Sequence, residues 1–157
     1  MDPVSIPADT MALAGRLALA TLLGAAVGVD REIALKPAGL RTHALVSLGA
    51  ALVTIVGLQL GHSGGDTAAP GRIIQGLVAG IGFIGGGVIL HREGGRAVHG
   101  LTTAASIWIA SGTGVAVGTG LWRGAVAAVV LSLVVLTLGR SLDDALRKVS
   151  RDHSDEN

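Results

Sequence analysis

The chain contains no cysteine, few aromatic residues and few charges. None of its 157 residues is cysteine, which excludes disulfides, metal–thiolate sites and thiol catalysis. Only 15% of the residues are charged, whereas a soluble domain of this length carries about 25%. Aromatic residues make up 2%, and basic residues do not cluster with them, so we expect no nucleic-acid partner. The composition indicates an apolar environment.

Catalytic and metal-binding motifs are also missing. The sequence has no plausible Ser-His-Asp set, no phosphate loop and no His-Glu-x-x-His motif, so we expect neither an enzyme nor a cofactor. No Asp or Glu lies within a long apolar run. Mg²⁺ prefers carboxylate oxygens and retained waters, so a simple cation path would lack ligands at mid-membrane. Whether a metal binds elsewhere is left open.

What the chain does have is hydrophobic residues and glycine. Half of its residues are hydrophobic, its mean hydropathy is +0.63, and it holds 25 glycines. A helix needs about 20 apolar residues to cross about 30 Å of hydrocarbon. The sequence predicts an all-α integral membrane protein with five transmembrane helices, at roughly Met11–Val29, Thr42–Leu60, Ile73–Leu90, Leu101–Gly118 and Leu121–Gly139.

Lys and Arg in the connections predict the orientation. The first segment carries Asp2 and Asp9 but no basic residue, so we expect a retained helix rather than a cleaved signal peptide. Basic residues mark the cytoplasmic side. We therefore expect an outer segment over 1–10, a transmembrane domain over 11–139 and a short cytoplasmic tail over 140–157. Nine of the twelve basic residues fall on one side: Arg31, Lys36, Arg41, Arg92, Arg96, Arg140, Arg147, Lys148 and Arg151.

One pattern occurs twice, 61 positions apart. Each copy is a Gly-rich apolar run, an Arg-Glu pair, a polar connection, and Gly-Leu-x-Thr-x-Ala opening a second apolar run. Both copies run from outside to inside and back, so they predict two parallel helical hairpins plus one extra helix; chance similarity among Gly- and Ala-rich helices is the alternative. The matching residues are Gly24, Val27, Arg31, Glu32, Gly39, Leu40, Thr42, Ala44 and Gly57 with Gly85, Val88, Arg92, Glu93, Gly100, Leu101, Thr103, Ala105 and Gly118.

The first hinge gathers most of the polar side chains. Pro37 prevents a continuous helix and Gly39 permits a sharp bend. Thr42 is a natural cap for the following helix, as Thr102 or Thr103 is for the fourth. The hinge is either a charged cluster that binds a partner or a structural ion-pair clasp. The expected inner-face cluster is Asp30, Arg31, Glu32, Lys36, Arg41, Thr42, Thr102 and Thr103, with Asp30, Glu32 or Glu93 as partners for Arg41 and His43.

The third run carries glycines at four-residue spacing, which is typical of close helix packing in membranes. Tight packing is the simpler interpretation, and a broken helix that exposes carbonyls to a substrate is the alternative. Since a small bundle does not bury every small-residue surface alone, we also expect contact with lipid and self-association. The expected packing or partner face is Gly76, Gly80, Gly82, Phe83 and Gly86, with Arg72 in the outer loop before it.

Two further residues stand out within the apolar runs. Arg16 either extends its side chain to the outer surface or finds a polar partner in the bundle. We expect Trp108 to pack inside the bundle and to find a partner for its indole N–H, with a ligand-binding role as the alternative.

Three segments together resemble the MgtC/SapB family of bacterial membrane proteins. They are Asp-Arg-Glu at 30–32 with Lys-Pro-Ala-Gly-Leu-Arg-Thr-His at 36–43, Gly-Ile-Gly-Phe-Ile-Gly-Gly-Gly at 80–87, and Gly-Leu-Thr-Thr-Ala-Ala-Ser-Ile-Trp at 100–108. The resemblance covers roughly Leu17 to Gly139. It implies a non-enzymatic protein of the bacterial inner membrane, a regulator linked to magnesium homeostasis, to growth in low magnesium and to virulence.

The resemblance also implies a partner. One class of the family is linked to restraint of the F-type ATP synthase, so such a complex is an expected partner. The alternative is a small oligomeric transporter or channel for Mg²⁺ or another ion. Longer members carry a soluble cytoplasmic domain, and since the chain stops at Asn157 we expect none here.

The chain departs from the family pattern at two positions. Members usually have Asp-Pro-x-Arg before the third helix, whereas this chain has Ala69 before Pro70, and Asp66 lies three residues earlier. A role for that carboxylate is therefore in doubt. Asp30 stands where Glu is common, a change that keeps the charge.

Overall fold

The computed structural model describes the backbone of residues 9–66, 68–90 and 99–154, and the side chains of residues 9–66, 68–89 and 99–142. Five helices and no strand occur in these ranges, and each helix contains a stretch long and apolar enough to cross a membrane. The predicted all-α fold with five spanning helices is confirmed. The helices are α1 (Thr10–Ile33), α2 (Leu40–Gly64), α3 (Ala69–Leu90), α4 (Leu101–Gly118) and α5 (Trp122–Ser154).

The helix starts follow the internal repeat. α2 begins directly after Gly39, and α4 begins directly after Gly100, 61 positions later. Gly100 has a φ of 89°, a left-handed conformation that glycine adopts without strain. The residue at the N-cap position of each helix is glycine, so it has no side chain that could cap the helix. The expectation that Thr42, Thr102 or Thr103 would be a cap was wrong, because all three lie inside the first turn.

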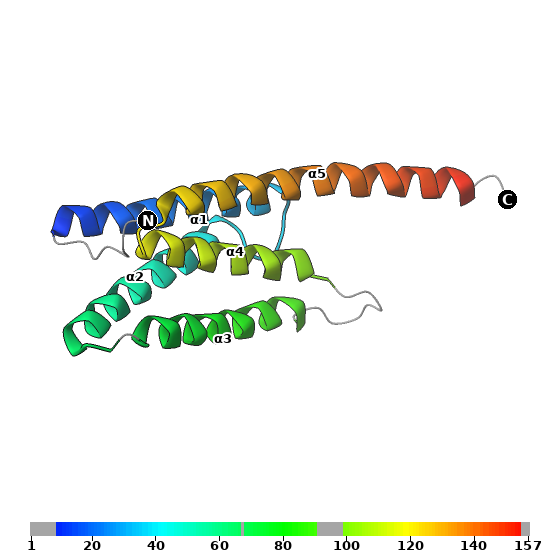
Figure 1. The fold of residues 1–157 in the computed structure, drawn as a ribbon. Coiled ribbons are helices and arrows are strands. Elements are labelled where there is room, and N and C mark those ends of the chain that lie inside the picture. The colour runs from blue at the N-terminus through cyan, green and yellow to red at the C-terminus, as the bar shows by residue number, and fades with distance from the viewer. Residues whose placement is uncertain (1–8, 67, 91–98, 155–157) are drawn as a thin grey trace.

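The two hairpins surround a central pair of helices. Within the described residues, α1 and α3 each contact both α2 and α4 but do not contact each other, so they lie on different sides of the α2–α4 pair. α5 contacts only α1 and α4, and Figure 1 shows it lying along α1 and α4 while α3 lies away from it. The arrangement is therefore two parallel hairpins with one added helix.

Glycines bring α1 and α4 close to the backbone of α2. A Cβ added at Gly24 would lie 2.5 Å from the His43 carbonyl oxygen, and one at Gly118 would lie 2.9 Å from the Ala51 carbonyl oxygen. Both approaches are too close for any side chain, so helix contact here depends on glycine. The contact is made by pairs at four-residue spacing, Gly24 and Gly28 in α1 and Gly114 and Gly118 in α4.

The repeat is visible in these contacts as well. Gly24 of α1 faces His43 of α2, and Gly85 of α3 faces Ala104 of α4. A Cβ added at Gly85 would lie 3.5 Å from the Cβ of Ala104. Each member of the second pair is 61 positions after its counterpart. The second hairpin is packed more loosely, since Gly85 leaves room for an ordinary van der Waals contact.

Three other expectations differ from the structure. The connection between α2 and α3 is short, because α2 continues to Gly64 and α3 begins at Ala69, so Arg72 lies in the first turn of α3 and not in a loop. α1 continues to Ile33, so Asp30 and Glu32 belong to a spanning helix. α5 is continuous from Trp122 to Ser154, so the helix extends beyond the expected end of the fifth span at Gly139 into the expected tail.

Some expectations lie outside the described residues. They are the outer segment before Asp9, the second hinge with Arg92, Glu93 and Arg96, and the side chains of the tail.

Candidate functional site

Polar side chains gather where α1 ends and where α2 and α4 begin. After Ile33 the chain turns tightly: the Lys36 N–H donates to the Arg31 carbonyl at 3.0 Å, and Leu35 has a φ of 53°. The turn leads directly to Gly39 and the start of α2. The last turn of α1 and the first turns of α2 and α4 therefore meet at one end of the bundle.

Arg31 lies at the centre of this region. Its side chain points inward and the residue is only 3% exposed. Its Nη2 donates to Thr103 Oγ1 of α4 at 3.0 Å, while its Nε has no partner among the described residues. A cation in the last turn of α1 is favoured by the helix dipole. The bond joins the first hairpin to the second through two residues of the expected cluster.

A chain of hydrogen bonds continues from Thr103 to α2. The Ser106 hydroxyl donates to the Thr103 carbonyl at 2.8 Å and lies 2.9 Å from Nε2 of His43. His43 Nδ1 lies 2.9 Å from the Gly39 carbonyl. A carbonyl only accepts, so Nδ1 carries a hydrogen. The Ser106 hydroxyl has a single hydrogen. If the His43 ring is charged, Nε2 donates to Ser106 and Ser106 donates to the Thr103 carbonyl; if the ring is neutral, Ser106 donates to Nε2 instead. Below, Arg31, His43, Thr103 and Ser106 are called the inner network.

Asp30 points to a different helix. Arg140 Nη2 of α5 donates to both carboxylate oxygens of Asp30, at 2.6 and 2.7 Å. The Asp30 side chain is 12% exposed and that of Arg140 is 40% exposed. The expectation that Asp30 would pair with Arg41 or His43 was wrong. Its role in the structure is to attach the extra helix to the first hairpin.

Glu32 caps the start of α2. Its Oε2 accepts from the Leu40 N–H at 2.9 Å, and Gly39 faces the same carboxylate so closely that a Cβ there would overlap it. A negative group is favourable at a helix N-terminus, where backbone N–H groups lack partners. Glu32 therefore has the capping function that the sequence had suggested for Thr42, and it is not a partner of Arg41.

The other expected cluster residues lie outside the inner network. Arg41 and Thr102 are exposed and Thr42 is half-buried. No acidic side chain of the described residues lies within ion-pair distance of Arg41. Lys36 lines a pocket of about 690 Å³ between the hinge and α3, together with Thr103. The structure thus brings Arg31 and Thr103 together. The two acidic residues of the expected cluster have other partners, since Asp30 bonds α5 and Glu32 bonds the start of α2.

Two arginines sit at the opposite end of the bundle. Arg16 Nη1 donates to the Gly118 carbonyl of α4 at 3.2 Å, so it has a partner in the bundle, as one of the two interpretations proposed. That carbonyl is at the C-terminus of α4, where a cation is favoured. Arg72 forms an ion pair with Asp66, which also accepts from the Ala68 N–H at 2.9 Å.

Asp66 therefore reaches Arg72 although it lies three residues before the usual family position. The hydrogen bond from Arg72 lowers the pKa of the Asp66 carboxyl, and the bond from the Ala68 N–H lowers this pKa further. In this chain the displaced carboxylate does contact the arginine at the start of α3.

The glycines expected to pack on α3 are not used in contacts among the described residues. Added Cβ atoms at Gly76, Gly80, Gly82 and Gly86 would meet no atom within 4 Å, and Phe83 is 87% exposed. The tight packing expected for these glycines is therefore absent from the described residues. α3 is one continuous helix over Ala69–Leu90, so the broken-helix interpretation was wrong.

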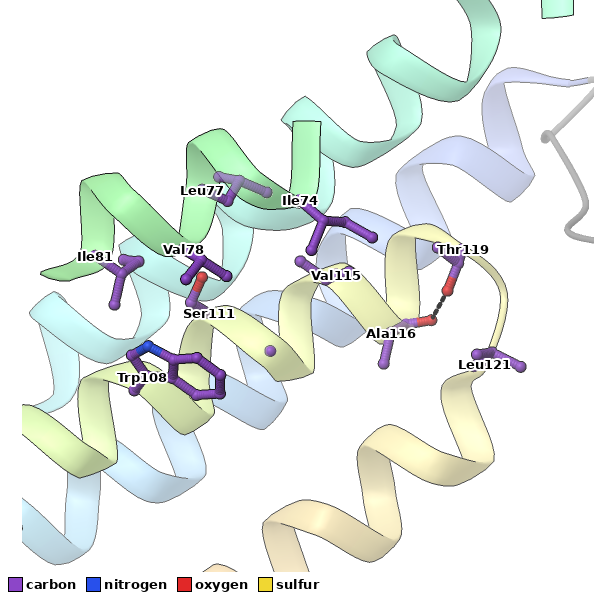
Figure 2. A pocket seen from close by; sticks show the side chains of 11 residues that line it. Ile74, Leu77, Val78, Ile81, Trp108, Ser111, Val115, Ala116, Thr119 and Leu121 are labelled. Atoms are coloured by element: carbon purple, nitrogen blue, oxygen red, sulfur yellow. Dashed lines mark hydrogen bonds between the residues drawn. The ribbon is translucent and has the colours of Figure 1, made fainter. Parts of the chain in front are cut away.

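Trp108 was also expected inside the bundle and is instead 51% exposed. It lines an apolar groove of about 310 Å³ between α3 and α4. Figure 2 shows its ring on α4 facing the groove, with Ile74, Val78 and Ile81 of α3 along the other wall. Within the described ranges, no group of three or more His, Asp or Glu could hold a metal ion.

Three important residues were missing from the expected site. His43 and Ser106 complete the inner network, and Arg140 holds Asp30. The repeat does not point to His43 or Ser106, because their equivalents 61 positions away are Ala104 and Leu45. Nothing in the sequence pairs Arg140 with Asp30, which lie 110 residues apart.

Five apolar spanning helices around a buried polar network define a multi-pass helical membrane protein. The chain belongs to the MgtC family, whose model matches residues 17–145. It is 42% identical over 132 residues to SrpB of Synechococcus elongatus, covering 78% of this chain and 72% of SrpB. It is 42% identical over 135 residues to MgtC of Salmonella typhimurium LT2, covering 86% and 54% of the two chains.

A third relative is YhiD of Escherichia coli K12, which is named as a proposed magnesium transporter. Identity to YhiD is 40% over 134 residues, covering 81% of this chain and 60% of YhiD. The chain thus spans between 54% and 72% of the length of these three relatives. No solved structure matches it.

Proposed function

We propose that this protein is a non-enzymatic regulator in the bacterial inner membrane that binds another membrane complex during growth in low magnesium. The observation that carries the proposal is the apolar groove between α3 and α4, which no described part of the chain covers (Figure 2). Aromatic side chains in a partly open groove are frequent anchors of protein contacts. Trp108 would be such an anchor for a helix of the partner.

The side of α3 next to this groove fits a helical partner. Val78, which lines the groove, is followed at four-residue spacing by Gly82 and Gly86, so these residues share one side of α3. Both glycines have open space in front of them. Small residues permit the close backbone approach on which helix association in lipid depends.

The inner network supports a structural rather than a chemical role for the hinge. Ser106 is buried, and its oxygen is shared between His43 and the Thr103 carbonyl. Asp30 and Glu32 are each bonded to another helix or helix end. These bonds join α4 to α1 and α2, and α5 to α1, so they fix the α4 wall of the groove relative to the first hairpin.

The link to magnesium rests on the relatives. MgtC and YhiD are relatives at about 40% identity, and the name of YhiD refers to magnesium. By the family resemblance, the F-type ATP synthase is the first complex to examine. We further propose that the N-terminus lies outside and the C-terminus in the cytoplasm, since Arg31, Lys36, Arg41 and Arg140 all lie at one end of the bundle.

The test is co-purification in mild detergent. The Trp108→Ala variant should lose the membrane complex that elutes with the unchanged protein, while retaining its own fold. Trp122→Ala is the matched control, because Trp122 is similarly exposed but stacks only on its neighbour Arg123. Equal recovery of the complex with both variants, or no complex with the unchanged protein, would contradict the proposal.

Ion transport is the second candidate, and the name of YhiD is the observation that favours it. Purified protein in liposomes would then conduct Mg²⁺ or another cation, and changing Glu32 or Arg72 would abolish the flux. Measurable flux that is lost in those variants would replace regulation with transport as the main function.

A further inference from the structure

A second groove runs between α2 and α3. Its volume is about 670 Å³ and its surface is mainly apolar. Gly76 and Gly80 lie on its α3 wall, and Val46, Gly49 and Val53 lie on its α2 wall. Added Cβ atoms at Gly49, Gly76 and Gly80 would all meet open space. The groove is therefore shallow, glycine-lined and uncovered within the described chain.

The internal repeat shows what kind of element such a groove accepts. A shift of 61 positions places α1 on α3 and α2 on α4, so the α1–α4 groove corresponds to the α2–α3 groove. The α1–α4 groove is filled by α5, whose Ala125 and Val129 are buried. Ala125 joins a core cluster with Ala20, and Leu19 and Leu23 pack against that cluster.

Three of the four α1 residues in or against that cluster have direct counterparts in the open groove. Shifted by 61 positions, Leu19, Ala20 and Leu23 correspond to residues that line it: Gly80, Ile81 and Ile84. The fourth α1 residue packed there, Leu17, corresponds to Val78 of the neighbouring α3–α4 groove. The α1–α4 groove therefore has its helix in place, and the equivalent α2–α3 groove is not covered by any described residue.

We propose that α3 of a second copy occupies this groove, so that the protein forms a parallel dimer about an axis along the membrane normal. The equivalent helix, α5, runs parallel to α1, because helices joined by short connections alternate in direction. An occupant of the open groove should likewise run parallel to α3. In a dimer whose two-fold axis lies along the membrane normal, the α3 helices of the two copies run parallel to each other, as required.

α3 also carries the residues that the contact requires. α5 buries Ala125 and Val129 at four-residue spacing, and α3 presents Gly76 and Gly80 at the same spacing. Facing glycines at this spacing allow two parallel helices to approach closely. Charge does not oppose the contact, because Arg72 at the outer end of α3 is neutralised by Asp66 in each copy.

The dimer is independent of the regulatory role proposed above. It uses the α2 side of α3, whereas the partner contact uses the groove between α3 and α4. Trp108→Ala should therefore remove the partner and leave the dimer, so the two proposals fail separately.

The absence of cysteine makes the experiment direct. Gly76→Cys and Gly80→Cys, made one at a time in the full chain, should each form a disulfide-linked dimer when native membranes are oxidised. Leu131→Cys, on the exposed side of α5, is the control and should stay monomeric. Dilution of the membranes with lipid should not abolish a specific dimer.

A second variant tests the contact without a crosslink. Gly80→Leu should leave the monomer folded, because the side chain enters open space, but should lower dimerisation in liposomes by about tenfold. The proposal would be overturned if Leu131→Cys formed the dimer and Gly76→Cys did not, or if Gly76→Cys captured a different protein. It would also be overturned if the protein were monomeric in both the crosslinking and the liposome experiment.

Discussion

Arg31 illustrates how single residues hold this bundle together. It is a buried cation whose guanidinium bonds the Thr103 hydroxyl of the other hairpin. A buried charge is costly unless it is paired and hydrogen-bonded. The geometry at this residue therefore couples the position of α4 to the end of α1.

Replacing Thr103 with Val should test this coupling. The change keeps the shape but leaves the Arg31 Nη2 without this acceptor, which should destabilise the fold by about 1.5–3 kcal/mol, the value for a hydrogen bond to a charged group. Thermal unfolding in detergent would measure the loss. The neighbouring exposed residue provides the control, and Thr102→Val should have little effect. Equal stability of the two variants would contradict a structural role for Arg31.

The ion pair between Asp66 and Arg72 predicts a pH dependence. The pKa of Asp66 is lowered in the folded protein, chiefly by the hydrogen bond from Arg72. A carboxyl whose folded pKa is depressed stabilises the fold above its unfolded pKa, and this contribution is lost as pH falls through the folded pKa. In Arg72→Gln, the Asp66 titration followed by NMR should move to higher pH. An unchanged midpoint would show that the ion pair does not form in the membrane.

The sequence identified Arg31 and Thr103 but not their geometry. The repeat and the family resemblance both pointed to the hinge. Which carboxylate faces which cation depends on helix rotation and on where α1 ends, and neither is encoded locally. Because α1 continues past Val29 to Ile33, Asp30 and Glu32 are directed by helical spacing to α5 and α2.

At the scale of elements, α2 is the helix against which α1 and α4 both pack. The glycine pairs of α1 and α4 both approach its backbone. The sequence identified glycine spacing as a packing signal, but assigned the packing to α3. Spacing alone does not distinguish a face that meets a neighbouring helix in the chain from one that faces outward.

Gly114→Ala should separate these cases. Its Cβ would overlap the Ser47 carbonyl of α2, a backbone atom that cannot move alone, so the variant should lose about 1–3 kcal/mol. Gly139→Ala in the middle of α5 meets open space and should gain about 0.5–1 kcal/mol from helix propensity. Thermal unfolding of both variants in the same detergent would measure the two changes in stability. A stable Gly114→Ala variant would rule out the close α2–α4 contact.

The attachment of α5 is a second test at this scale. Asp30 and Arg140 are partly shielded, so a double-mutant cycle should give a coupling energy of about 1 kcal/mol, the upper end for exposed ion pairs. The reversed pair, Asp30→Arg with Arg140→Asp, should recover most of the stability lost in either single variant. Purely additive effects would mean that α5 is held by apolar contacts alone.

At the scale of the whole molecule, composition and hydropathy were sufficient to predict five helices and their order. The repeat predicted that α2 and α4 would begin at equivalent glycines, as they do. The unfilled positions beside α3 could not be predicted, since they appear only when the packing of every helix is known. They are also the features on which the proposed partner contact and dimer depend.

The central claim is that the chain crosses the membrane five times with the inner network on the cytoplasmic side. Single cysteines at Leu35 and Leu121, both exposed and at opposite ends of the bundle, test it in intact cells with a thiol reagent that cannot cross the membrane. Leu121→Cys should react from outside, and Leu35→Cys should react only after the cells are opened. Reaction of both from outside, or protection of both, would contradict the account.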